Sequence, residues 1–153
     1  MPDAVTHLLT ARVAGALLRR PEPRAILYLG VLWPDLLAKG TQAVLHCPPG
    51  FDVPSHSIPG LLVACWGAAL LFGPARREAA FGLLMAGSLL HLAADLLKDY
   101  GVYSGLRLFF PFSDRGFSLG LFRSEESAFA LPVAAALLLT IELVARRRSR
   151  VGG

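Results

Sequence analysis

The sequence predicts an all-α membrane protein, a single domain (residues 1–153) built as a bundle of about five helices with a long phenylalanine-rich loop before the last helix. Hydrophobic residues make up 54% of the chain and charged residues 17%, whereas soluble proteins carry about 25% charged residues. Five apolar stretches are rich in Leu, Ala and Val without strict alternation, which favours helix over strand. Basic residues cluster between these stretches, as they do in the cytoplasmic loops of membrane proteins.

The first two apolar stretches are shorter than a usual membrane span. Residues 4–18 contain Arg12, and residues 25–37 are interrupted by Pro34. A transmembrane helix needs about 20 consecutive apolar residues. Both stretches are therefore expected to be tilted, interfacial or half-buried in the bundle.

Three later stretches, residues 58–73, 79–97 and 128–145, approach the length of a span. At 1.5 Å rise per residue they nearly cross a hydrocarbon core of about 30 Å. The sequence therefore predicts three spans, and five if the first two stretches also cross. Small residues, which let membrane helices approach closely, lie within the first, third and fourth apolar stretches: Gly15, Gly67, Gly82 and Gly87.

Two connections stand out between the apolar stretches. Residues 38–57 cannot be helical throughout, because they contain Pro48, Pro49, Gly50 and Pro54. Residues 98–127 are long for a connection, and long loops are often functional. This second connection carries five of the nine phenylalanines: Phe109, Phe110, Phe112, Phe117 and Phe122. We expect it to pack over the mouth of the bundle or to dip into the lipid interface.

The distribution of charge argues against several kinds of protein. The net charge is +4, but hardly any aromatic residue is interleaved with the basic clusters and no nucleic-acid motif accompanies them, so nucleic acid is excluded as a partner. Two cysteines at no recognisable spacing exclude a disulfide framework. The basic clusters are Arg19, Arg20 and Arg24, then Arg76 and Arg77, then Arg146, Arg147, Arg148 and Arg150.

Ionisable residues inside apolar stretches are costly and often functional. His91 and Asp95 are four residues apart, which places both on one helical face, where an imidazole and a carboxylate suit a divalent metal. Asp35 ends the second stretch, His56 precedes the third, and His7 lies near the start of the first.

Topology brings these residues to the same end of the bundle. If the arginine clusters face the cytoplasm and all five stretches cross, the candidate ligands lie on the opposite, non-cytoplasmic side of the membrane. The sequence therefore predicts one divalent metal site, with zinc as the expected ion and manganese or iron as alternatives. As an alternative to ligation, one of the two carboxylates, Asp35 or Asp95, would act as the catalytic base. The predicted ligands are His7, Asp35, His56, His91 and Asp95.

Each of these residues also has a simpler interpretation. His7 is compatible with a helix cap or a packed imidazole, and Ser55 and Ser57 are typical N-cap residues. His91 and Asp95 are equally compatible with a buried hydrogen-bonded pair without metal.

The motifs taken together resemble the membrane-bound, metal-dependent hydrolases, a family of inner-membrane-associated proteins. The resemblance implies a helical membrane protein whose metal is carried by the histidines and aspartates named above, with a distant likeness to zinc-dependent phospholipase C proteins. The matching pieces run in the family's order over nearly the whole chain: Thr6-His7-Leu8, Pro34-Asp35, Ser55-His56-Ser57-Ile58-Pro59-Gly60, His91-Leu92-Ala93-Ala94-Asp95, Phe110-Pro111-Phe112-Ser113-Asp114-Arg115 and Phe117-Ser118-Leu119.

The chain departs from the family pattern at Leu37, where the family usually has a second acidic residue, and at Val53 and Pro54, near which a basic residue is common. The first departure weakens the case for two metals and favours a single site or a degenerate enzyme.

The expected function is metal-assisted hydrolysis of a phosphoester in a lipid or lipid-linked substrate at the membrane surface. Arg107, Arg115 and Arg123 are suited to contact a phosphate or to anchor the loop at the interface. The alternatives are a non-enzymatic membrane protein for metal sensing or transport, a scaffold locked by the same residues, and a soluble helical enzyme. No oligomeric state is favoured.

Overall fold

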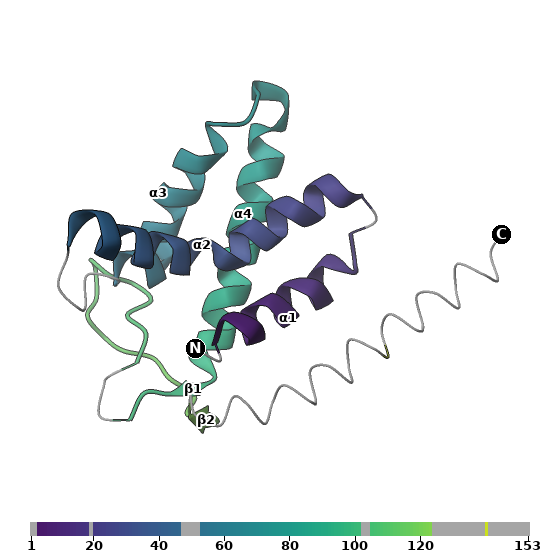
Figure 1. Cartoon of the computed structure of the whole chain (residues 1–153). Helices are drawn as coiled ribbons and strands as arrows, with labels where there is room; N and C mark the ends of the chain where they lie inside the picture. Colours follow the sequence, from purple (N-terminus) through teal and green to yellow (C-terminus); the bar gives the residue numbers. More distant parts are fainter. Residues whose placement is uncertain (1–2, 19, 47–52, 102–104, 124–139, 141–153) are drawn as a thin grey trace.

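The computed structural model describes residues 3–18, 20–46, 53–101, 105–123 and 140. Most of these residues are helical, and Figure 1 shows α3 and α4 side by side, with α2 crossing α4 and α1 beside the lower half of α4. The elements in chain order are α1 (Asp3–Gly15), α2 (Pro21–Leu45), the 3-10 helix η1 (Pro54–His56), α3 (Ile58–Ala69), α4 (Pro74–Leu96), β1 (Lys98–Asp99) and β2 (Phe122–Arg123).

Helix α2 is longer than the sequence predicted. It runs through Pro34 to Leu45, so the prediction of a stretch ending at residue 37 and a loop starting at residue 38 was wrong. Proline cannot donate the backbone hydrogen bond that would reach the carbonyl of Gly30 one turn earlier. The hydroxyl of Ser88, on α4, donates to that carbonyl instead at 3.0 Å. The packing of α4 therefore compensates for the missing bond, and the helix continues.

The crossing of α2 and α4 is close because each helix has a glycine at the contact. A Cβ atom at Gly30 would lie 2.5 Å from the carbonyl oxygen of Leu84, and a Cβ at Gly87 would lie 2.4 Å from that of Leu27. Small residues of this kind allow helix backbones to approach in membrane proteins. The contact places the turns that follow the two glycines beside each other, and these turns carry Asp35 and His91.

Helix α3 begins at Ile58, as the sequence predicted, and ends earlier than the predicted stretch. Ser57 caps its N-terminus and accepts a hydrogen bond from the backbone of Gly60 at 3.2 Å, so the expectation of an N-cap is confirmed for Ser57. Ser55 instead contacts Nδ1 of His56 at 3.0 Å. The helix ends at Ala69, and α4 begins at Pro74.

One helix in the described part of the chain, Pro74–Leu96, is long and apolar enough to cross a membrane. Helix α3 is apolar but has only 12 residues, so the expectation that residues 58–73 form a full span is not met. Of the predicted fifth stretch, residues 128–145, the structure describes residue 140 alone. The five-helix, multi-pass arrangement therefore stays a prediction.

Residues 98–101 and 105–123 contain more regular structure than a plain loop. Strand β1 pairs in parallel with β2, and Leu106 forms a bridge with Phe117. Leu106 is buried in the core with Leu61 of α3 and Leu92 of α4. The segment therefore packs across the end of the bundle, as one of the two sequence alternatives proposed (Figure 1).

Candidate metal centre

The centre is built around His91, which is completely buried on α4. Its Nδ1 lies 2.8 Å from the carbonyl oxygen of Val31 on α2. A carbonyl only accepts, so Nδ1 carries the proton and Nε2 of the neutral ring carries a lone pair. Within the part of the chain that the structure describes, this buried Nε2 has no hydrogen-bond partner.

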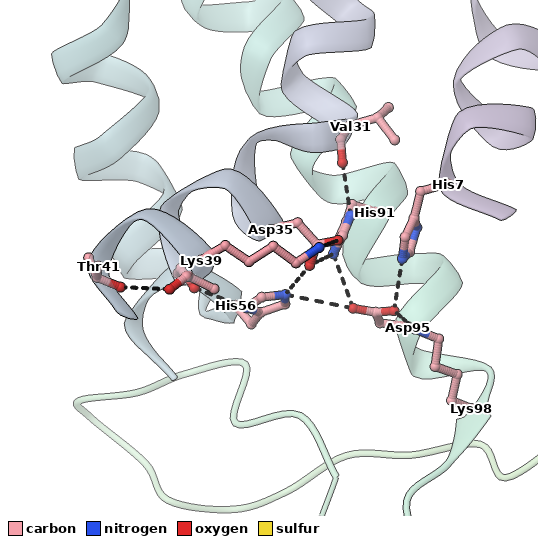
Figure 2. Close-up of polar contacts among 11 residues, drawn as sticks. His7, Val31, Asp35, Lys39, Thr41, His56, His91, Asp95 and Lys98 are labelled. Atoms are coloured by element: carbon pink, nitrogen blue, oxygen red, sulfur yellow. Dashed lines mark hydrogen bonds and ion pairs between the residues drawn. The ribbon is translucent and has the colours of Figure 1, made fainter. Parts of the chain in front are cut away.

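Nε2 of His91 lies beside two carboxylates. Nε2 lies 3.1 Å from Oδ2 of Asp95 and 4.0 Å from Oδ1 of Asp35. An imidazole lone pair and an ionised carboxylate oxygen are both acceptors, so they repel each other unless a positive charge lies between them. Either a second ring proton or a metal cation must therefore occupy this position. Figure 2 shows these groups turned toward one another.

Asp95 connects most of the other groups of the centre. Its Oδ1 accepts from Nε2 of His7 at 3.2 Å and pairs with the ammonium group of Lys98. Its Oδ2 faces His91, and Nε2 of His56 lies 3.9 Å away. Oδ1 is thus occupied by two donors, which leaves Oδ2 as the oxygen suited to a metal (Figure 2).

Asp35 and His56 form the second side of the centre. Nε2 of His56 lies 3.7 Å from Oδ1 of Asp35, and the contact between Ser55 and Nδ1 of His56 holds the ring in this orientation. Such contacts to the second ring nitrogen are typical of metal-binding histidines. The imidazole of His56 beside it lowers the pKa of Asp35 to about 2, although partial burial opposes the shift. Asp35 is therefore ionised at neutral pH, as a metal ligand must be.

His7 approaches the centre from α1. Its ring stacks on that of His91, with the ring centroids 3.8 Å apart and an angle of 18° between the planes. In this arrangement Nε2 of His7 donates to Asp95, so His7 orients the carboxylate. To bind the metal through Nε2, His7 would have to exchange this proton for the cation.

Among the residues that the structure describes, two groups of three have ligand atoms close enough to hold a cation, and both include His91. The first is His7, His91 and Asp95, and the second is Asp35, His56 and His91; the ligand atoms within each group lie within 4.8 Å of one another. The one lone pair on Nε2 of His91 cannot serve two cations at once. The geometry therefore favours one cation, in agreement with the missing acidic residue at Leu37.

The structure brings all five residues predicted from the sequence together, from α1, α2, η1 and α4 (Figure 2). Sequence reasoning missed three partners: the carbonyl of Val31, Lys39 beside Asp35 at 3.6 Å, and Lys98 beside Asp95. The two lysines follow their aspartates by four and three residues, a helical spacing that brings side chains together. That spacing would have identified both.

Lys98 and Lys39 give a test of how burial affects the two ion pairs. Their side chains are 10% and 56% exposed. We expect Lys98→Met to lower the free energy of unfolding of the metal-free protein by about 3 kcal/mol, because it leaves a buried carboxylate without its partner. Lys39→Met should change it by about 0–1 kcal/mol, as for surface pairs. Added zinc should reduce the difference in unfolding free energy between the two variants, because the charge of the cation compensates the carboxylate of Asp95. Denaturant unfolding in detergent, with and without zinc, measures both effects, and equal losses in the two variants would contradict the expectation.

The fold and the centre together define a class of protein: a helical protein in which histidines and carboxylates from four elements meet near the end of a candidate membrane helix. A family model described as YdjM inner membrane protein matches residues 1–152, and the chain belongs to this family. Membership supports the association with the inner membrane that the sequence predicted. Comparison with curated proteins and with solved structures finds no match.

Proposed function

We propose that the protein is a metal-dependent hydrolase that acts at the membrane surface on phosphoesters of lipids or lipid-linked molecules. The observation that carries the proposal is the buried Nε2 of His91, which has no well-aligned hydrogen-bond partner among the described residues and lies 3.1 Å from Oδ2 of Asp95 and 4.0 Å from Oδ1 of Asp35. A cation bound between these atoms would satisfy the nitrogen and both carboxylates. The sequence resemblance to membrane-bound, metal-dependent hydrolases supports the same assignment.

The donor set suits zinc. Imidazole nitrogens and carboxylate oxygens are ordinary zinc ligands, and catalytic zinc sites use three protein ligands with one position left open. Asp35, His56 and His91 provide such a set, with Oδ2 of Asp95 close by. A zinc ion held there supplies Lewis-acid chemistry, which polarises a phosphoryl oxygen and eases the ionisation of an attacking water.

The two carboxylates differ in what they can contact. Asp95 is buried and surrounded by His7, His91 and Lys98, so we assign it to holding the metal. The side chain of Asp35 is 28% exposed, which leaves it open to a substrate or a water molecule. Its low pKa makes it a good ligand and a weak base, so its expected role is to bind and to orient the attacking water. The exposed ammonium of Lys39 beside it is suited to a phosphate oxygen.

The position of the centre supports a substrate at the membrane. Asp95 lies in the last turn of α4, the candidate span, while Arg76 and Arg77 lie in its first turns. If α4 crosses the membrane with the arginines on the cytoplasmic side, the centre lies near the opposite surface. Lipid phosphates are found at that depth.

Metal content and turnover test the proposal directly. We expect the protein purified in detergent to carry about one zinc per chain, and to hydrolyse bis(p-nitrophenyl) phosphate or phospholipid in a chelator-sensitive manner. Asp35→Asn should lower turnover about 100-fold or more, since orienting and proton-transfer roles contribute at least that much. His46→Asn is the matched control: His46 is an exposed histidine at the end of α2 with a φ of 50°, a conformation that asparagine tolerates. It should leave both metal content and turnover unchanged.

Other outcomes would favour the alternatives. Stoichiometric zinc without turnover on any phosphoester would favour a non-enzymatic metal protein. A protein that takes up no zinc would indicate that the same side chains only lock α1, α2 and α4 together.

A further inference from the structure

Residues 105–123, which we call the interface loop, expose several large apolar side chains. Phe112 is 85% exposed, Leu121 is 70% exposed, Leu119 is 64% exposed and Phe109 is 47% exposed. By contrast, Leu106 of the same loop is buried in the core. The loop is therefore folded onto the bundle, and these four apolar side chains point outward. An apolar surface of this kind marks a place of contact with a partner or a membrane.

The interface loop suits neither bulk water nor the hydrocarbon layer. Water disfavours the exposed phenylalanines and leucines. The hydrocarbon layer disfavours the loop's backbone, which is largely irregular, because unsatisfied N–H and C=O groups are costly there. The headgroup layer accepts both, since aromatic side chains partition into it and polar backbone groups remain hydrated.

The charges of the loop indicate what it would contact. Arg107, Arg115 and Arg123 all lie at the surface, and the guanidinium of Arg115 is 5.8 Å from the centre of the Phe117 ring. Arg107 lies 3.6 Å from Asp114. Three arginines against one aspartate make the loop basic, and guanidinium groups match phosphate oxygens. Basic residues beside apolar side chains are typical of segments that bind anionic lipid surfaces.

Backbone hydrogen bonds attach the loop to the end of the candidate span. The N–H of Leu119 donates to the carbonyl of Leu96 at 2.7 Å, and that of Leu121 donates to Leu97 at 2.9 Å. The hydroxyl of Ser118 donates to the carbonyl of Lys98 at 2.5 Å. The loop therefore lies where α4 ends, at the level of the lipid headgroups if α4 spans the membrane, and it is joined directly to the residue that pairs with Asp95.

We propose that the interface loop binds the headgroup layer of a membrane containing anionic phospholipid, with Phe112 and Leu121 inserted among the lipids and the arginines at the phosphates. The loop thereby holds the end of α4 at a fixed depth. This binding does not depend on metal or on turnover, so it stands or fails separately from the proposed hydrolase function.

Fluorescence quenching in vesicles tests the depth of the loop. The full chain, with Cys47→Ser and Cys65→Ala to remove other thiols, is labelled with a bimane at Phe112→Cys and reconstituted into phosphatidylcholine vesicles with or without phosphatidylglycerol. We expect lipids with a doxyl group at carbon 5 to quench the label more than lipids with the group at carbon 12, and aqueous iodide to quench it weakly. Asp114→Cys is the matched control, since Asp114 lies in the same loop with an 80% exposed side chain. Its label should be more accessible to iodide.

The arginines provide the second arm of the test. Arg107→Gln and Arg115→Gln should each raise the iodide quenching constant of the label at Phe112→Cys by up to about fivefold in vesicles with phosphatidylglycerol. The increase should be much smaller in phosphatidylcholine alone. A label at Leu121→Cys repeats the measurement if the Phe112 variant fails to fold. Equal iodide quenching at positions 112 and 114 would overturn the proposal. Stronger quenching of the Phe112 label by the carbon-12 lipid than by the carbon-5 lipid would also overturn it. Protection from both iodide and lipid quenchers would also overturn it, because it would show that protein covers the loop.

Discussion

Replacing His91 with alanine is expected to abolish stoichiometric zinc binding. His91 is the one residue that belongs to both groups of potential ligands, so its loss removes either arrangement of the metal. Removal of a residue that only orients a ligand costs about 10–100-fold in metal affinity, and loss of the shared ligand should lower zinc affinity by more than about 100-fold. Titration with zinc in detergent, followed by metal analysis of the purified variant, measures the change.

The control for His91→Ala is Ser88→Ala on the same helix. Ser88 is also completely buried and bonds to Gly30 of α2, but its hydroxyl lies outside both ligand groups. Loss of its hydrogen bond should lower the free energy of unfolding by about 1 kcal/mol and leave zinc binding intact. If the two variants lost zinc equally, the effect would be one of folding, and His91 would have no special place in the centre.

Replacing Gly87 with valine should have the largest effect on stability. Even a single Cβ at this position would lie 2.4 Å from the carbonyl oxygen of Leu27 and 2.6 Å from the nitrogen of Val31. Both are backbone atoms of α2 that cannot rotate away, so the helices must separate. Overpacking of a core costs about 1–3 kcal/mol, and we expect the upper end of this range or more. Separation would also lengthen the bond between His91 and Val31, so zinc affinity should fall with stability.

Gly82→Ala is the matched control for this second substitution. Gly82 lies on the same helix, but a Cβ there would meet nothing within 4 Å. Alanine is a better helix former than glycine by about 1 kcal/mol, so this variant should be as stable as the parent or more stable. Thermal unfolding in detergent compares the two variants, and a similar melting temperature for both would show that the close crossing of α2 and α4 is unimportant.

Several features of the fold and the centre were predictable because they depend on neighbours in the chain. The spacing of four residues between His91 and Asp95 places them on one face wherever the helix lies. Ser57 before Ile58 and Pro59 predicts the start of a helix. Charge and hydropathy likewise predicted helical segments and association with a membrane, and the family resemblance predicted the inner membrane that family membership supports.

The end of α2 was not predictable in the same way. Pro34 was expected to interrupt the second stretch, because proline lacks an N–H donor, and the stretch was expected to end at Leu37. The chain continues as helix because the hydroxyl of Ser88, more than fifty residues away along the chain, satisfies the carbonyl of Gly30. A contact between α2 and α4 therefore allows the helix to continue past the proline, and no local sequence pattern contains that contact.

Residue types and their spacing along single helices were thus sufficient to name the five side chains of the centre, because helical geometry is local. The proton position on His91, the pairing of Lys98 with Asp95 and the choice between one cation and two are consequences of how α1, α2 and α4 pack. Each depends on distances of 2–4 Å between atoms far apart in the chain. Such distances are set by the glycine contact between α2 and α4, and they become known when the folded chain is seen.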